Sequence, residues 1–185
     1  MALVVFLRGV NVGGHKTFRP SILAQQLKHY DAVNVGAAGT FVIRKRANQA
    51  ELRAELQRRL PFETEVMICT GQDVINMASS DPFRNTPIQS DVVRFVSVLA
   101  KRPRVLPSLP LSLPAEGVWL VRVLAVENRF ILGMYRRHMK TIRYLYAIDK
   151  LFGVPVTTRN WSTFTAIIKI LKDGREKTPA PTPLR

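Results

Sequence analysis

Short apolar runs separated by polar segments predict alternating strands and helices in the first part of the chain. Residues 3–7 are continuously apolar, which predicts a buried strand. Pro20 suits the first position of a helix, and the apolar residues that follow it to residue 30 recur at helical spacing. Residues 33–43 predict two strands around the small residues Gly36-Ala37-Ala38-Gly39.

A second helix and a further strand complete this unit. Asn48 and Glu51 predict a capping box, and leucines then follow at every fourth position as far as Pro61, which ends the helix. Residues 65–70 predict a strand. Thr70 and Asp73 predict the cap of a short helix directly after it. The expected order is therefore β-α-β-β-α-β followed by one short helix.

The remainder of the chain repeats this order with one exception. Residues 92–99 predict a strand, and residues 118–126 and 130–135 predict a hairpin. A helix whose apolar positions are Ile142, Leu145, Ile148 and Phe152 ends at Gly153, before a strand at residues 154–158. We expect Asn160 to cap a last helix with Trp161, Phe164, Ile168 and Leu171 on its inner face.

The exception lies between the strand at residues 92–99 and the hairpin, where a proline-rich connection replaces the expected helix. Four prolines within residues 103–114 forbid a regular helix and favour an extended segment whose leucines pack on the body. The pattern predicts an α+β fold of two ferredoxin-like halves with antiparallel sheets, at residues 1–80 and 90–172. Residues 173–185 lack periodicity and predict a disordered tail.

Composition narrows the class of protein. The length of 185 residues and the apolar fraction of 46% are those of a globular protein, and the sequence contains no apolar run long enough to span a bilayer. The single cysteine, Cys69, excludes an intramolecular disulfide and lies in an apolar run, which favours a buried thiol and a cytoplasmic location. The net charge of +15 favours anionic partners, among them nucleic acid, phosphates and carboxylates.

Two polar segments are the candidate binding elements. The first contains Arg8, Asn11, Gly13, Gly14 and Lys16, directly after the first predicted strand. It approaches the phosphate-binding pattern G-x-x-x-x-G-K-[ST], but His15 stands between the last glycine and the lysine and breaks the required register. The remaining interpretations are an anion pocket of basic side chains and glycine amides, and a tight turn ordered by Asn11.

The second segment contains Thr158, Arg159 and Asn160, directly before the last predicted helix. Arg159 is a candidate bidentate donor to a carboxylate or phosphate, whereas a purely structural role for the segment would make Asn160 a helix cap and Trp161 a core residue. A joint site requires the two segments to lie close in space.

Other chemistries have little support in the sequence. The three histidines are isolated from carboxylates at metal-ligand spacing, which indicates no metal site. No serine, cysteine or threonine stands in a nucleophile-elbow context, so the pattern identifies neither a catalytic residue nor a cofactor. The strand at residues 40–43 offers one aromatic residue, Phe41, too few for the stacking surface of an RNA-recognition module.

The two end motifs together resemble the DUF1697 family of bacterial proteins of unknown function. The chain reads LRGVNVGG near its start and TTRNW near its end, and Asp81-Pro82-Phe83 also fits the family pattern. The resemblance implies an α+β fold with ferredoxin-like parts and supplies no reaction. Two segments depart from the family: Ala37-Ala38-Gly39-Thr40 replaces a more polar stretch, and the proline-rich connection replaces a helix.

These observations give a ranked set of hypotheses. The leading hypothesis is a protein that binds an anionic small molecule or a phosphate-bearing ligand at Arg8, Asn11, Gly13, Gly14, Lys16, Thr158, Arg159 and Asn160. Nucleic-acid binding through the basic surface is the alternative, and an enzyme of undetermined reaction is the third. The sequence leaves the oligomeric state open.

Overall fold

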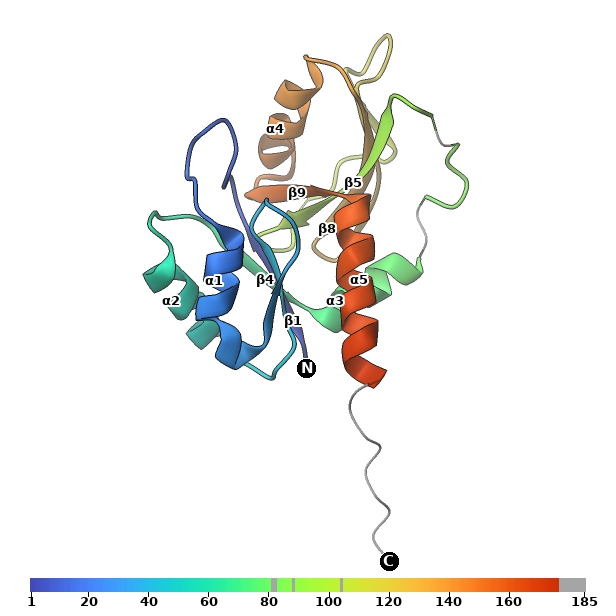
Figure 1. The fold of residues 1–185 in the computed structure, drawn as a ribbon. Coiled ribbons are helices and arrows are strands. Elements are labelled where there is room, and N and C mark those ends of the chain that lie inside the picture. Colours follow the sequence, from blue (N-terminus) through green and yellow to red (C-terminus); the bar gives the residue numbers. More distant parts are fainter. Residues whose placement is uncertain (81–82, 88, 104, 177–185) are drawn as a thin grey trace, which may run out of the picture.

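The chain folds around two antiparallel sheets, which a computed structural model describes over residues 1–80, 83–87, 89–103 and 105–176 (Figure 1). Asp81 and Pro82, which contribute to the family resemblance, and residues 177–185 of the expected tail lie outside the described residues. The α+β class expected from the sequence is confirmed.

The first half has the predicted β-α-β-β-α-β order. It consists of β1 (Leu3–Leu7), α1 (Pro20–Gln26), the short 3-10 helix η1 (Lys28–Tyr30), β2 (Ala32–Asn34), β3 (Thr40–Ile43), α2 (Gln49–Arg59) and β4 (Val66–Thr70). The sheet order is β2-β3-β1-β4, with β1 antiparallel to both of its neighbours, which is the ferredoxin-like arrangement. The helix α3 (Gly71–Ser79) follows without a break.

Helix caps explain where α2 and α3 begin. The side chain of Asn48 accepts hydrogen bonds from the backbone N–H groups of Ala50 (2.8 Å) and Glu51 (3.3 Å), which is one side of the predicted capping box. At α3 both sides of the box are present. Thr70 Oγ1 accepts from the N–H of Asp73 (3.1 Å), and the Asp73 carboxylate accepts from the N–H of Thr70 (3.1 Å).

The second half repeats the topology without the first helix. Its elements are β5 (Val92–Leu99), β6 (Leu111–Leu113), β7 (Val121–Glu127), β8 (Phe130–Arg136), α4 (Thr141–Phe152), β9 (Val156–Asn160) and α5 (Trp161–Glu176). The order β7-β8-β5-β9 is again ferredoxin-like, and β6 adds one strand at the edge beside β7. The proline-rich connection supplies β6, and Leu109, Leu111 and Leu113 pack against the apolar cluster beneath α4, as the sequence predicts.

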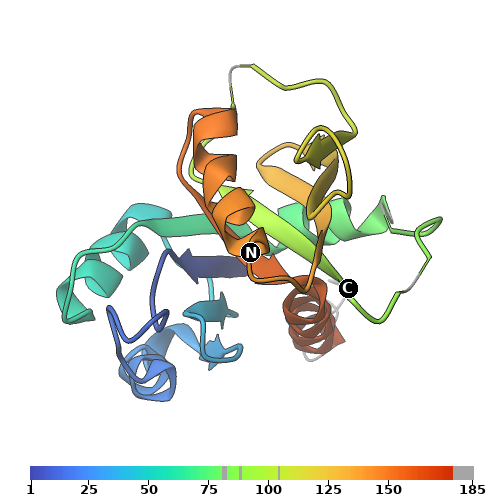
Figure 2. The same ribbon diagram turned by 90° about the horizontal axis from the view of Figure 1, so that it is seen from above.

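The core explains why β1 is buried on both of its faces. Leu3, Val5 and Leu7 of β1 pack against α1 and α2, whereas Val4 and Phe6 point to the opposite face. That opposite face packs against α3, α5 and the inner face of the second sheet, so α1 and α2 lie away from α3 and α5 (Figure 2).

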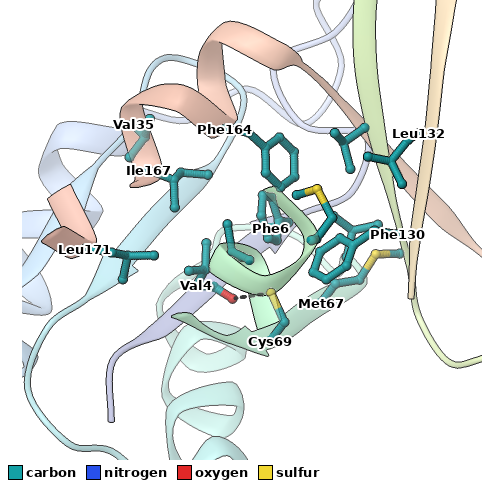
Figure 3. Close-up of a cluster of buried hydrophobic side chains, with 14 of the residues drawn as sticks. Val4, Phe6, Val35, Met67, Cys69, Phe130, Leu132, Phe164, Ile167 and Leu171 are labelled. Carbon is teal, nitrogen blue, oxygen red and sulfur yellow. Dashed lines mark hydrogen bonds between the residues drawn. The ribbon is translucent and has the colours of Figure 1, made fainter. Parts of the chain in front are cut away.

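One buried apolar cluster is formed from residues of both halves (Figure 3). The ring of Phe6 stacks on that of Phe164 at 5.5 Å between centroids, and Phe130 of the second sheet meets Phe164 edge-on at 6.3 Å. Ile167 and Leu171 of α5 extend this contact along the first sheet. The two halves therefore share a core. The helix α5 continues to Glu176, so its last four residues lie in the segment that the sequence predicted as a tail.

Cys69 belongs to this shared cluster and is buried on β4. Burial raises the pKa of its thiol to about 12.

In the described part of the chain, no helix is long and apolar enough to cross a membrane.

Candidate functional site

The two polar end segments meet in space. Arg159 on β9 donates from Nη2 to the carbonyl oxygen of Leu7 at 2.8 Å, and Arg8 donates from Nε to the carbonyl oxygen of Val156 at 3.1 Å. These hydrogen bonds join residues about 150 positions apart in the sequence, as |i−j| is 152 and 148. The end of β1 and the edge strand β9 therefore contact each other, which satisfies the geometric condition for a joint site.

A single open cleft of about 1580 Å³ lies at this junction. Most of its lining comes from the end of β1 with the following loop, the end of α2 with the connection to β4, and the outer face of α4 with β9; Ala38, Ala100 and Tyr135 also line it. Of the predicted site residues, Arg8, Lys16, Thr158, Arg159 and Asn160 line the cleft. Asn11, Gly13 and Gly14 belong to the same loop but not to its described lining.

Arg159 is a buried cross-link between the two halves. Its side chain has five N–H groups, and all are donated to protein acceptors. Nε reaches Thr40 Oγ1, Nη1 reaches Thr157 Oγ1 and the Thr158 carbonyl, each at 2.8 Å, and Nη2 reaches the carbonyls of Leu7 (2.8 Å) and Ala38 (2.6 Å).

These acceptors are neutral, and no described carboxylate forms an ion pair with Arg159. Burial lowers the pKa of the guanidinium to about 10, because the low-dielectric surroundings disfavour the charged form. The group remains a cation at neutral pH, so it places an uncompensated positive charge at the base of the cleft.

Arg8 is more exposed and is held from two sides. Its Nη2 forms an ion pair with the Asp149 carboxylate on α4, and its Nε is bonded to Val156, while 43% of the side chain is accessible to solvent. Thr64 Oγ1 donates to the Arg8 carbonyl and fixes the backbone. Arg8 lines the cleft, and its Nη1 makes no hydrogen bond to the described residues.

The loop after β1 is ordered by its own side chains. Asn11 adopts a left-handed conformation (φ +55°), donates from Nδ2 to the Ala37 carbonyl (2.8 Å) and accepts at Oδ1 from the Phe18 N–H (2.9 Å). Gly13 and Gly14 also have positive φ and form the exposed turn beyond it. Asn11 therefore supports the loop through its side chain.

Lys16 closes the same loop against the opposite side of the cleft. Its Nζ donates to the Glu63 carbonyl at 2.6 Å, and its backbone carbonyl accepts from the Asn11 N–H at 3.2 Å. An ammonium has three N–H groups, so two remain for other acceptors.

The end of β9 adds two further polar groups. Thr158 Oγ1 lies 2.6 Å from Ser97 Oγ, and Asn160 Oδ1 accepts from the Tyr135 hydroxyl at 3.2 Å. Burial raises the pKa of Tyr135, so this hydroxyl keeps its proton. Asn160 Nδ2 makes no hydrogen bond within the described residues.

The segment where the chain departs from the family pattern contributes through its backbone. The carbonyls of Ala37 and Ala38 accept from Asn11 and Arg159. Any residue type supplies a carbonyl, so these two contacts do not require the polar side chains that the family pattern has there.

Sequence reasoning missed the contribution of α4. The sequence marks Ile142 and Leu145 only as apolar positions of this helix. In the structure they line the cleft together with Tyr146 and Asp149, and the buried positions are Thr141, Ile148 and Phe152. The signal was present in the sequence, because α4 is apolar on two faces and a surface helix needs only one.

No group of three or more histidine, cysteine, aspartate or glutamate side chains is placed to hold a metal ion among the residues that the structure describes. The cleft offers instead a buried cation, an exposed arginine, amide and ammonium donors, and apolar side chains.

Comparison with known proteins identifies the family. No curated protein matches the sequence. The fold is similar to that of the conserved bacterial protein SP0830 from Streptococcus pneumoniae, with a TM-score of 0.54 and 17% identity over 92% of this chain and 98% of that one. The family model described as "Protein of unknown function (DUF1697)" matches residues 1–110, which include the first polar segment but not the second. The chain therefore belongs to the DUF1697 family.

Proposed function

We propose that the cleft binds a small molecule through an anionic group, a carboxylate or a phosphate. The observation that carries this proposal is the pairing of two arginines at the junction of the halves. Arg159 supplies a buried charge that no described carboxylate neutralises, and Arg8 supplies an accessible guanidinium beside it. Because a buried charge is weakly screened, an anion in the cleft is stabilised by both.

The donors for such an anion come from side chains that the fold leaves partly unused. These are Nη1 of Arg8, Nδ2 of Asn160 and the free N–H groups of Lys16. Arg159 acts through its charge, because its own donors are occupied. Hydrogen bonds from charged donors to an anion are roughly twice as strong as those between neutral groups.

Carboxylates in the cleft set a limit on its affinity for anions. Asp149 holds Arg8 and competes directly with a ligand. Glu63 and Glu65 also line the cleft, but both are exposed, and water and salt weaken their repulsion. Asp149 is therefore the carboxylate whose removal should matter most.

Paired variants test the proposal. Isothermal titration with a panel of carboxylates, inorganic phosphate and sugar phosphates should find at least one anion that binds. Arg8→Gln should weaken its binding about tenfold or more, since it removes a charge-assisted bond. Asp149→Asn should strengthen binding severalfold, because it frees the guanidinium while keeping the shape of the side chain.

Arg46→Gln serves as the matched control, because Arg46 is exposed and lies outside the described lining of the cleft. It removes the same charge from the protein and should leave affinity unchanged at 0.15 M salt. If no anion in the panel binds, or if Arg46→Gln weakens binding as much as Arg8→Gln, the cleft is not the anion site.

A further inference from the structure

The helix α4 presents a second apolar face to the cleft. Ile142 and Tyr146 are large apolar side chains with 56% and 65% of their surfaces exposed, and Leu145 lies half-buried beside them. All three line the cleft, and Leu145 also packs against the core cluster to which Ile148 and Phe152 on the other face of the helix belong. Exposed apolar residues grouped in a cleft are typical of a binding surface.

The spacing along α4 ties this face to the charged end of the cleft. Residues 142, 145, 146 and 149 form one stripe, since positions three and four apart lie on the same side of a helix. Asp149 ends the stripe and pairs with Arg8. Tyr146 therefore lies three residues, about 4.5 Å along the helix axis, from the residue that holds the exposed arginine.

An aromatic side chain also lies in the opposite wall. Phe62, in the connection between α2 and β4, lines the same cleft and packs edge-on against Phe18, with ring centroids 5.9 Å apart and an interplanar angle of 82°. This contact holds the Phe62 ring in place. The cleft thus combines aromatic groups on two walls with positive charge at its base.

From this combination we infer that the ligand carries a planar aromatic ring next to its anionic group, as a nucleoside monophosphate does. The inference rests on the proposed anion site and specifies its substrate class. The phosphate occupies the end formed by Arg8 and Asn160, and the base packs on Tyr146. In a nucleoside monophosphate one sugar ring separates these groups, which is comparable to the rise of about 4.5 Å between Tyr146 and Asp149.

The charge at the base of the cleft argues for this occupant over a purely apolar partner. An apolar helix from another protein would cover Ile142 and Tyr146, but it would leave the free donors of Arg8 and Asn160 buried without acceptors, which is costly. An aromatic anion satisfies both the apolar face and the donors.

Isothermal titration with four probes tests the inference: inorganic phosphate, ribose 5-phosphate, adenosine and adenosine 5′-monophosphate. The nucleotide should bind about tenfold or more tightly than ribose 5-phosphate, as expected for one stacked base. Tyr146→Ala should remove that advantage and leave the affinity for ribose 5-phosphate unchanged. Tyr144→Ala is the control for loss of a tyrosine from the same helix, since Tyr144 packs partly against the core and lies outside the described lining of the cleft.

The outcomes separate this inference from the proposed function. Equal affinities for nucleotide and ribose 5-phosphate, or a nucleotide affinity unaffected by Tyr146→Ala, would overturn the aromatic ligand while the anion site stands. If no probe binds and sedimentation shows a dimer that Tyr146→Ala dissociates, a second copy of the chain covers the face, and the inference is wrong. If no probe binds and the protein sediments as a monomer, the inference of a nucleotide-like ligand is wrong, and the carboxylates of the titration panel above decide whether the anion site stands.

Discussion

Replacing Arg159 by methionine should destabilise the protein strongly, because one side chain joins the two halves at their junction. Methionine keeps much of the length and apolar contact of arginine, so the substitution mainly removes the guanidinium. Five hydrogen bonds are then lost, to Thr40, Thr157 and the carbonyls of Leu7, Ala38 and Thr158. The affected acceptors are buried or partly buried and lose a charged donor.

The magnitude follows from two opposing terms. A hydrogen bond to a charged group contributes about 1.5 kcal/mol at the lower end of its range, so the five bonds together contribute roughly 7 kcal/mol. Burying the charge costs about 3 kcal/mol, the free energy that corresponds to lowering the pKa from about 12.5 to about 10. Methionine avoids that cost, which leaves a net loss of about 4 kcal/mol.

Urea denaturation followed by circular dichroism measures this loss directly. In thermal unfolding, we expect the same loss to lower the melting temperature of a protein of this size by roughly 8–16 °C. Arg46→Met, at an exposed position, should change the free energy of unfolding by less than about 0.5 kcal/mol. A loss below about 1 kcal/mol in Arg159→Met would refute the reasoning, because the hydrogen bonds would then contribute nothing beyond the cost of burying the charge.

Two further predictions concern positions away from the cleft lining. Gly39→Ala should lower the free energy of unfolding by about 2 kcal/mol or more, because Gly39 has φ +70° and an added Cβ would lie 2.7 Å from Val10 Cγ2. Gly36 has φ +75° but no atom within 4 Å of an added Cβ, so Gly36→Ala should cost only the backbone strain of about 1 kcal/mol. Thermal unfolding of the two variants should show this difference. Cys69 should make the protein less stable at alkaline pH, because above its ordinary pKa of about 8.5 the unfolded chain loses the thiol proton while the native state retains it up to about pH 12. At pH 10 this thiol lowers the free energy of unfolding by about 2 kcal/mol. The difference in free energy of unfolding between the wild type and Cys69→Ala should therefore shrink by that amount between pH 8 and pH 10. An unchanged difference would show that the thiol ionises normally in the native state.

The sequence predicted most of the element order because its local signals agree. A continuous apolar run marked β1, and a largely apolar segment marked β5. Gly153 ends α4 in the left-handed conformation that its position suggested. The proline-rich connection was recognised because proline excludes a regular helix whatever its surroundings. The helical end of the chain was harder to place, since residues 173–176 have no apolar pattern and extend α5 all the same.

The candidate site was harder to predict because its geometry comes from long-range contacts. Arg8 and Arg159 stood out as polar residues at the ends of strands, but nothing in the sequence shows that Arg159 donates all its N–H groups inward while Arg8 faces the cleft. The sequence could not show that Ile142 faces the cleft, because the spacing of apolar residues does not show which face of a helix meets the body. Asp149 lacked any local pattern that would connect it to Arg8.

The shared core has a consequence for the synthesis of the protein on the ribosome. The face of the first sheet that carries Val4 and Phe6 is covered in part by Phe164, Ile167 and Leu171 of α5. At a translation rate of about 5–20 residues per second, roughly 5–20 s pass between the emergence of β4 and that of Leu171. During that interval the nascent chain exposes an apolar sheet face, so a chaperone that shields it would act before the last helix arrives.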